Sequence, residues 1–469
     1  ESIRRWLSVG TPKCATTQPT PITDQMVRYP LRAACTWASL SQAPGRPYDV
    51  PVSERNHLID LARIVSVLVV VVFHTLLWVV AVPDGRLEIY PWAPGPVWWA
   101  LSWIFTIVPV FFVAAGYANA VVVDKWRASG APYSTFLVLR GGRLLGPMTF
   151  FFAAFTLVGT IAAWAGWPAE AATLSRQFAQ LFWFAVVYQL LLAASPLAVW
   201  LHDRFGGWAM LPLLLASIVV DVSVRSSGEL SLQWLNLAFV WPLAHQWGIA
   251  YHRGWFRGWR MGALLALLVS CVVVIAGLVF GLGYPPAAPA WADVLVANLL
   301  PPTCAIVVLG LAQAVVLAML ERAGVAARLS AGTQQVVRVA NALLLTVYLW
   351  QIPAILIGAG ALAGLSLLWA AAAPVLLNRL VVVALVLAIV VATVPWLARV
   401  ELKLIPESGE LATPRGLAEV AYGLFCAGTF AIWQLGAVLH PSAAWSAAGV
   451  VLFIIGVVAL RRACRSSVG

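Results

Sequence analysis

The sequence predicts an all-α integral membrane protein, a polytopic bundle of about twelve transmembrane helices. Of its 469 residues, 62% are hydrophobic and only 10% are charged, and the surface of a water-soluble domain of this length would not tolerate that balance. Apolar runs long enough to cross a bilayer recur along the chain, and basic residues gather in alternate loops between them. These observations exclude a soluble enzyme.

The predicted spans are apolar runs of about 18 residues or more, with one shorter run in fifth place. They lie at residues 61–82, 97–123, 144–164, 178–200, 208–222, 232–251, 261–282, 294–319, 340–361, 380–400, 417–439 and 443–460. Residues 1–54 contain no such run and are rich in Pro, Thr, Ser and Arg. We therefore expect them to form a disordered basic arm.

The distribution of Lys and Arg predicts how the bundle is oriented. Basic residues follow the second, sixth, eighth and last spans: Lys125, Arg127, Arg140, Arg143, Arg253, Arg257, Arg260, Arg322, Arg328, Arg338, Arg461, Arg462 and Arg465. By the positive-inside rule these loops and both termini face the cytoplasm of a bacterial plasma membrane. The net charge of +11 then reflects topology and contact with anionic lipids, and it does not indicate nucleic acid binding.

The cysteines predict no metal centre. Six are scattered along the chain without a CxxC pair or any other metal-ligand spacing, so we expect neither a zinc site nor a disulfide framework.

Three charged or titratable residues lie directly before or within the first part of the first apolar span: Asp60, Arg63 and His74. Charged and titratable side chains are costly in a bilayer, so when a membrane helix carries them they normally have a functional role. Eleven residues at about 100° each make three turns plus about 20°, which places Arg63 and His74 on one face, about 16 Å apart along the axis. We expect both side chains to point into one solvent-filled tunnel.

Arg140 and Arg143 lie one helical turn apart before the third span, with Gly141 and Gly142 between them. Guanidinium groups bind phosphates in a bidentate manner, and the glycines would let a ligand approach the backbone. The alternative is that the two arginines only follow the positive-inside rule.

His74 is a candidate general base because an apolar site keeps imidazole neutral, the form that can take a proton from a hydroxyl. The alternative is a structural histidine bonded to a neighbouring helix. Asp60 cannot orient the ring, since about fourteen helical residues separate them by roughly 21 Å. Candidates for that task are Tyr188, Gln189, His245, Gln246, Tyr348 and Gln351, each of which is more often a residue that joins helices.

Three segments in succession resemble the membrane acyltransferase family 3. They are Asp60 to His74 with its Arg63, then Phe111-Phe112-Val-Ala-Ala-Gly116-Tyr117, and then Arg140-Gly-Gly-Arg143 followed by Leu-Leu-Gly-Pro147. Order, spacing and residue types all match, and the resemblance covers about residues 55–401.

The resemblance implies a fold of ten helices at residues 55–402, with two additional helices and a short tail at residues 403–469. It implies transfer of an acyl group, commonly acetyl, from cytoplasmic acyl-CoA to a hydroxyl of a carbohydrate or glycolipid of the cell envelope. Acetyl-CoA would then be the donor. Arg63, Arg140 and Arg143 would bind it, and His74 and Asp60 would each be catalytic residues.

Two positions depart from the family pattern. Ala115 stands where the family usually has Ser, although Gly116 still allows close helix packing. Gln351 stands where the family has His, and Gln cannot shuttle a proton at neutral pH. A relative that binds acyl-CoA or glycolipid without turnover therefore stays open, and so does a secondary transporter of twelve helices.

Outer-loop tryptophans, including Trp92, Trp98 and Trp99, are typical interfacial anchors. The alternative is that they stack on a sugar.

Overall fold

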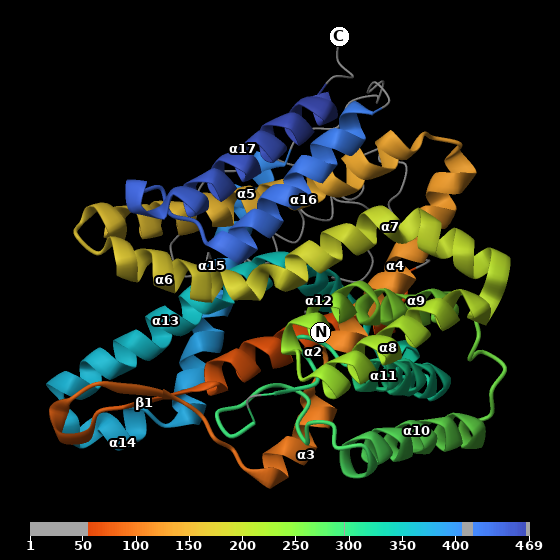
Figure 1. The fold of residues 1–469 in the computed structure, drawn as a ribbon, viewed down its shortest axis with the longest axis horizontal. Coiled ribbons are helices and arrows are strands. Elements are labelled where there is room, and N and C mark those ends of the chain that lie inside the picture. Colours follow the sequence, from red (N-terminus) through yellow and green to blue (C-terminus); the bar gives the residue numbers. More distant parts are fainter. Residues whose placement is uncertain (1–54, 295, 406–415, 466–469) are drawn as a thin grey trace, which may run out of the picture. The chain divides into compact units, whose positions relative to one another are not determined.

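The computed structural model describes residues 55–294, 296–405 and 416–465, and these residues form a helical bundle with one short hairpin (Figure 1). The predicted arm at residues 1–54 and parts of residues 403–469 lie outside them. The α-helices are α2 (His57–Leu76), α3 (Pro96–Phe105), α4 (Val108–Ser129), α5 (Tyr133–Trp164), α6 (Pro168–Ala179), α7 (Trp183–Phe205), α8 (Leu211–Ser227), α9 (Val240–His252), α10 (Met261–Ala276), α11 (Cys304–Arg322), α12 (Ala331–Ala342), α13 (Leu344–Leu368), α14 (Ala373–Leu376), α15 (Arg379–Leu404), α16 (Leu417–Leu435) and α17 (Ala444–Arg465). The strands are β1 (Trp78–Ala81) and β2 (Glu88–Pro91).

Short 3₁₀ or π segments connect several helices: η4 (Pro83–Gly85), η5 (Gln180–Phe182), η6 (Gly206–Met210), η7 (Leu230–Ala238), η8 (Gly277–Gly281), η9 (Ala326–Arg328), η10 (Ala370–Ala372) and η11 (Pro441–Ala443).

The predicted fold class is confirmed: the protein is a polytopic helical membrane protein. Within the described residues, nine helical segments are long and apolar enough to cross a membrane. We predicted about twelve spans. The numbers differ because Pro168–Ser227 is one helical segment where we predicted two spans. In addition, residues 232–251 form an α-helix of only 13 residues after a 3₁₀ turn, and α16 is not among the nine.

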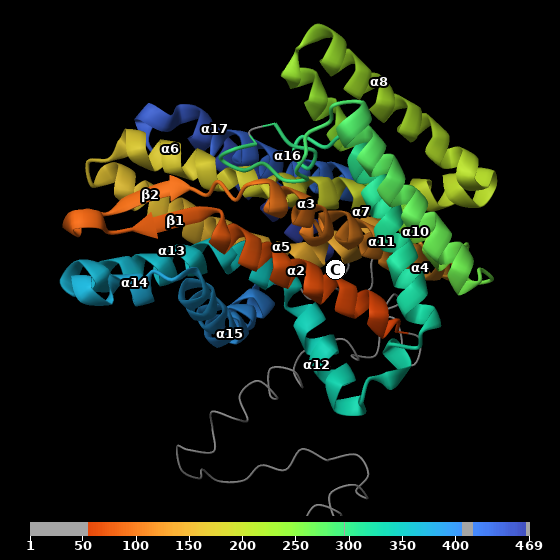
Figure 2. The ribbon, with the colours of Figure 1, turned by 90° about the horizontal axis from the view of Figure 1, so that it is seen from below.

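Helix α2 carries the polar residues of the first span. The Asn56 side chain caps its first turn by accepting from the backbone N–H groups of Leu58 (3.0 Å) and Ile59 (3.3 Å). The helix ends at Leu76, short of our predicted boundary at residue 82, because residues 78–81 pair with residues 88–91 in an antiparallel hairpin. In Figure 2 this hairpin adjoins one end of α2, and α12 packs near the other.

Two other predicted spans contain prolines and are not single continuous helices of the predicted length. Residues 97–123 divide into α3 and α4 at Thr106 and Ile107, and Pro109 is the second residue of α4. Residues 294–319 become helical only from Cys304, because Pro301 and Pro302 disfavour a helical conformation of the residues before them. Apolar composition identified both segments, but it did not locate where each helix begins.

Helices α4 and α9 approach each other through two glycines. A Cβ added to Gly116 would lie 1.9 Å from the carbonyl oxygen of His245, and one added to Gly248 would lie 1.9 Å from that of Val113. Side chains on either glycine would force the backbones apart. The expected packing role of Gly116 is therefore confirmed.

We expect Gly116→Ala to destabilise the fold by at least about 3 kcal/mol, because a backbone carbonyl occupies the space of the new methyl group. The measurement is the thermal midpoint of the purified protein in detergent. Gly360→Ala in α13 is the matched control: no atom lies within 4 Å of the added Cβ, so that change should be neutral or stabilising by about 0.5–1 kcal/mol. Equal midpoints for both variants would contradict the packing argument.

The two C-terminal helices form part of the bundle that holds α5. Among the described helices, α16 and α17 pack against each other most extensively, and both pack against α5 (Figure 1). Gly428 and Gly456 bring their backbones together, since added Cβ atoms would lie 2.3 Å and 2.6 Å from Phe453 and Phe425. The Tyr422 hydroxyl of α16 donates to the Gln189 carbonyl of α7 at 2.9 Å.

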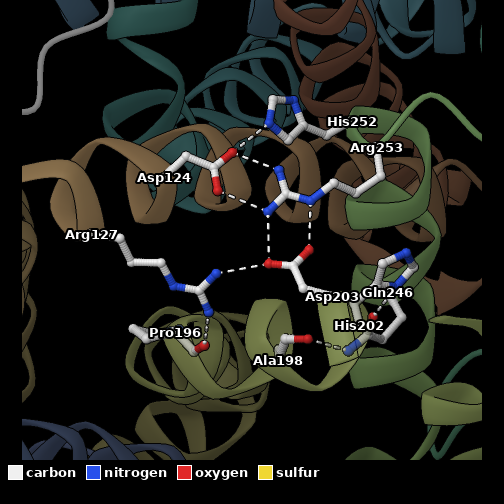
Figure 3. A network of polar contacts seen from close by, with 9 residues as sticks. All are labelled: Asp124, Arg127, Pro196, Ala198, His202, Asp203, Gln246, His252 and Arg253. Atoms are coloured by element: carbon white, nitrogen blue, oxygen red, sulfur yellow. Dashed lines mark hydrogen bonds and ion pairs between the residues drawn. The ribbon is translucent and has the colours of Figure 1, made fainter. Parts of the chain in front are cut away.

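An ion network joins α4, α7 and the end of α9 (Figure 3). The Arg253 guanidinium donates to both carboxylate oxygens of Asp124 (2.6 and 2.8 Å) and of Asp203 (2.7 and 3.1 Å). Arg127 donates to Asp203 at 2.8 Å, and His252 contacts Asp124 at 2.9 Å. Hydrogen bonds to Asp124 and then to Asp203 raise the pKa of Arg253, so this guanidinium stays charged.

We expect Arg253→Met to lower the free energy of unfolding by about 1–3 kcal/mol, because two carboxylates lose their shared cation in a partly buried setting. Thermal unfolding in detergent measures this, and the neighbouring exposed Arg204→Met serves as control. The difference in unfolding free energy between wild type and Arg253→Met should decrease little in moderate salt, as expected for a bidentate network. If the Arg204 variant lost as much stability, the network would not be the cause.

Candidate functional site

Three arginines predicted from sequence, Arg63 of α2 and Arg140 and Arg143 of α5, interact electrostatically. The strongest electrostatic influences on Arg140 are Tyr188, Arg143, Arg63 and Tyr422, so two further cations and two phenols surround it. Arg140 is half-buried, whereas Arg143 is exposed. The Nε atoms of Arg63 and Arg140 have no hydrogen-bond partner among the described residues. Clustered guanidinium groups repel one another, and a polyanion would relieve that repulsion.

Arg63 points from α2 towards α4. Its guanidinium lies 5.5 Å from the centroid of the Phe111 ring, a cation–π contact. Phe111 in turn contacts Phe184 (4.8 Å between centroids) and Tyr188 (6.3 Å) on α7. Phe111 of the Phe-Phe segment thus packs against the Arg63 guanidinium and is itself supported by two aromatic rings of α7.

Asp60 is buried at the start of α2 and joins it to α12. Its Oδ1 accepts from Asn341 Nδ2 at 2.8 Å, and Arg55 lies 4.0 Å from its Oδ2. Arg63, three residues further along α2, is also an electrostatic neighbour. These contacts place Asp60 at the opposite end of α2 from His74, so it orients helices and does not contact the imidazole.

His74 occupies the last turn of α2, two residues before the helix ends. Its Nδ1 contacts the Val70 carbonyl oxygen at 2.8 Å. Because a carbonyl only accepts, Nδ1 carries the proton, and the lone pair of the neutral ring is then on Nε2. The geometry therefore supplies the tautomer that a base acting through Nε2 needs.

Among the six candidate partners of His74, Gln351 is the one that interacts with the imidazole ring. The Nε2 of Gln351 donates to the Tyr348 carbonyl at 3.1 Å, and its Oε1 has no hydrogen-bond partner among the described residues. The other five lie elsewhere: Tyr188 is beside Arg140, Gln189 contacts Met148, His245 contacts Asn119, Gln246 contacts His202, and the Tyr348 hydroxyl donates to the Leu181 carbonyl.

The stripe of α2 between Arg63 and His74 is occupied by apolar side chains. Val67 is 5% exposed and packs in one cluster with Phe111, and Val70 is half-buried. The solvent-filled tunnel that we expected is thus interrupted here by packed hydrocarbon. The arm of a ligand that reaches from Arg63 to His74 must displace these valines.

Gly141, between Arg140 and Arg143, does not serve the predicted purpose. A Cβ added to Gly141 would lie 2.8 Å from the Tyr422 ring of α16, and Gly142 is also buried. Gly141 lets α16 approach α5, so it is a packing residue rather than an opening for a ligand. Gly146 has the same role, since its added Cβ would lie 2.4 Å from the Glu401 carbonyl oxygen.

Sequence reasoning missed three buried polar residues. Asn119 of α4 lies between Arg140 and His245. Asp221 of α8 accepts from Asn236 (2.7 Å) and Tyr284 (2.9 Å). Glu401 accepts from Thr346 (2.5 Å) and Trp350 (3.2 Å), although it follows a predicted span. The available signal in each case was a single polar residue within or directly after an apolar run.

Aromatic rings surround the end of α2 beyond His74. Trp92 contacts Trp98 and Trp291, with centroids 5.4 and 5.5 Å apart. The Arg379 guanidinium lies 3.9 Å from the Trp92 ring centroid, and Trp99 donates to Asp293 at 3.2 Å. Charged groups accompany these rings, which is compatible with a polar ligand as well as with a membrane interface.

The described part of the chain contains no group of three or more His, Cys, Asp or Glu residues that could hold a metal ion.

Residues 56–400 match a family model described as an acyltransferase domain. No curated protein and no solved structure matches the chain.

Proposed function

Because that match covers most of its length, the protein belongs to the acyltransferase 3 family, and from this premise we propose that it transfers an acyl group from cytoplasmic acyl-CoA to a hydroxyl of a surface carbohydrate or glycolipid. It is a membrane acyltransferase at the level of its family. The observation that carries the finer proposal is that Arg63 and Arg143 are both electrostatic neighbours of Arg140, and that Arg63 lies on the helix that presents His74.

The donor would bind through the phosphates of its coenzyme A. Three guanidinium groups with no carboxylate among the main neighbours of Arg140 suit a ligand that carries several negative charges. We place this site on the cytoplasmic side, where the positive-inside rule puts Arg140 and Arg143 and where acyl-CoA is made. The thioester arm would then extend along α2 towards His74, about 16 Å from Arg63.

His74 would activate the acceptor. In the proposed step the acceptor hydroxyl gives its proton to Nε2 of His74 while its oxygen attacks the thioester carbonyl carbon. The C–S bond breaks, the acyl group remains on the acceptor oxygen as an ester, and the coenzyme A sulfur takes the proton from the imidazolium. Acetyl is the group we favour, because the valines and phenylalanines between Arg63 and His74 leave little room for a long chain.

The acceptor would arrive from the side of the β1–β2 hairpin. His74 lies in the last turn of α2, and the rings around Trp92 and Trp98 adjoin that end. A sugar that stacks there would have its hydroxyls within a short distance of the imidazole. Both termini would then be cytoplasmic, as the charge distribution predicts.

The test is mass spectrometry of surface glycans and glycolipids from cells with the gene, without it, and complemented with it. We expect acylated species to lose the mass of one acetyl group per site on deletion and to regain it on complementation. Identical glycan profiles, together with normal production of the protein, would refute the proposal. A non-catalytic relative would give the same refuting result while still binding acyl-CoA.

The transporter alternative has less support. Family membership points to acyl transfer, and transport would require matched polar sites in two repeated halves.

A further inference from the structure

Asn119 and His245 form a polar contact between α4 and α9, and neither residue takes part in the proposed reaction step. Asn119 is 2% exposed and His245 is 1% exposed. The Asn119 Nδ2 lies 3.1 Å from His245 Nε2, and Arg140 Nη2 lies 3.5 Å from Asn119 Oδ1. The three side chains form a line from α9 through α4 to the arginine cluster.

The chemistry of the three groups assigns their orientations. A guanidinium can only donate, so the atom of Asn119 that faces Arg140 must be its carbonyl oxygen. The amide nitrogen then faces His245, whose Nε2 must accept. His245 is therefore neutral with its proton on Nδ1, an atom without a hydrogen-bond partner among the described residues.

Close backbone packing holds this line in place. Gly116, three residues before Asn119 on the same face of α4, lies directly against the His245 carbonyl, where an added Cβ would be 1.9 Å away. The Asn119 amide thus has a fixed position opposite the His245 ring. A flexible arginine next to it gains a fixed acceptor for one of its N–H groups.

We propose that Asn119, held by His245, positions Arg140 for the phosphates of acyl-CoA without neutralising its charge. This inference rests on the proposed function. An amide suits the task because it accepts one hydrogen bond and adds no negative charge. A carboxylate in its place would pair with Arg140 in a low-dielectric setting and would repel the donor phosphates. Asn119 and His245 are positioning residues and touch no reacting atom.

Asn119→Asp tests the proposal with two donors, acetyl-CoA and S-acetyl-pantetheine, which lacks the nucleotide and its phosphates. We expect KM for acetyl-CoA to rise at least about tenfold, while kcat for acetyl-CoA and both constants for S-acetyl-pantetheine change less than about twofold. A merely structural residue would affect both donors alike. An unchanged KM for acetyl-CoA, or equal losses with both donors, would overturn the proposal.

His245 offers a second pair of variants. His245→Gln keeps an acceptor for the Asn119 amide and should retain near wild-type KM for acetyl-CoA, whereas His245→Leu should raise it. If both variants behaved alike, His245 would not hold Asn119. Asn378→Asp is the matched control, because Asn378 caps α15 by accepting from Leu380 N–H, a position that tolerates a carboxylate.

Equilibrium binding of coenzyme A, measured by calorimetry on detergent-solubilised protein, separates this proposal from the function on which it rests. If the wild-type protein binds coenzyme A but transfers no acetyl group, the proposed reaction is refuted. The affinity of the Asn119→Asp variant for coenzyme A then decides whether Asn119 positions Arg140. If Asn119→Asp does not fold, Asn119→Ser is measured in the same way, and an unchanged affinity again overturns the proposal.

Discussion

His74→Ala should abolish acyl transfer while the protein stays folded in the membrane. Removing the general base should lower kcat by roughly 10²–10⁴-fold, since Gln351, its neighbour, cannot take a proton in its place. Donor binding should be unchanged, because His74 lies in the last turn of α2 and Arg63 eleven residues earlier. The measurements are the rate of transfer to the acceptor and the affinity for coenzyme A.

His74→Gln separates catalysis from structure. Glutamine can still donate to the Val70 carbonyl but cannot act as a base, so this variant should be stable and equally inactive. His440→Ala, in the turn between α16 and α17, is the control and should keep full activity. Wild-type-like transfer by either His74 variant would remove the imidazole from the mechanism.

Arg140→Ala should weaken the donor site most among the arginines. Loss of charge-assisted hydrogen bonds of about 1.5–3 kcal/mol corresponds to a rise in KM for acyl-CoA of roughly 10- to 100-fold, with kcat at saturating donor little changed. Arg140→Lys should restore only part of the affinity, because an ammonium cannot form the bidentate contact. Arg143→Ala should act in the same direction with a smaller effect, since Arg143 is exposed.

Arg176→Ala is the matched control for the loss of one positive charge. Arg176 is exposed on α6 and contacts Thr173 of the same helix at 3.4 Å. Its removal should leave KM for acyl-CoA unchanged. A KM that did not respond to Arg140→Ala would show that the arginine cluster has another purpose, such as attraction of anionic lipid.

The features that sequence predicted well are those that depend on neighbouring residues of one helix. Arg63 and His74 do lie on one continuous helix, because the apolar run between them contains no Gly or Pro that would break it. Gly116 does pack against another backbone, because a glycine in an apolar membrane helix lets a neighbouring helix approach closely. Whether Arg63, Arg140, Arg143, His74 and Asp60 perform their predicted roles stays a prediction.

The features that sequence predicted poorly depend on segments far apart in the chain. Helix α2 ends at Leu76 because a hairpin partner pairs with residues 78–81, and the apolar composition of those residues fits helix and strand alike. The role of Gly141 depends on Tyr422, and the burial of Glu401 depends on Thr346 and Trp350 of α13. None of these partners is specified by local periodicity.

Composition and periodicity were sufficient for the membrane class, for most of the helices and for the residues worth testing, because a bilayer demands long apolar helices and makes every charge within them costly. Which of those residues meet was decided by packing: the arginines of α2 and α5 converge, Gln351 and not His245 lies beside His74, and Asn119 stands between His245 and Arg140. Contacts between helices follow from the shapes of surfaces brought together in folding, and a linear pattern does not contain those shapes.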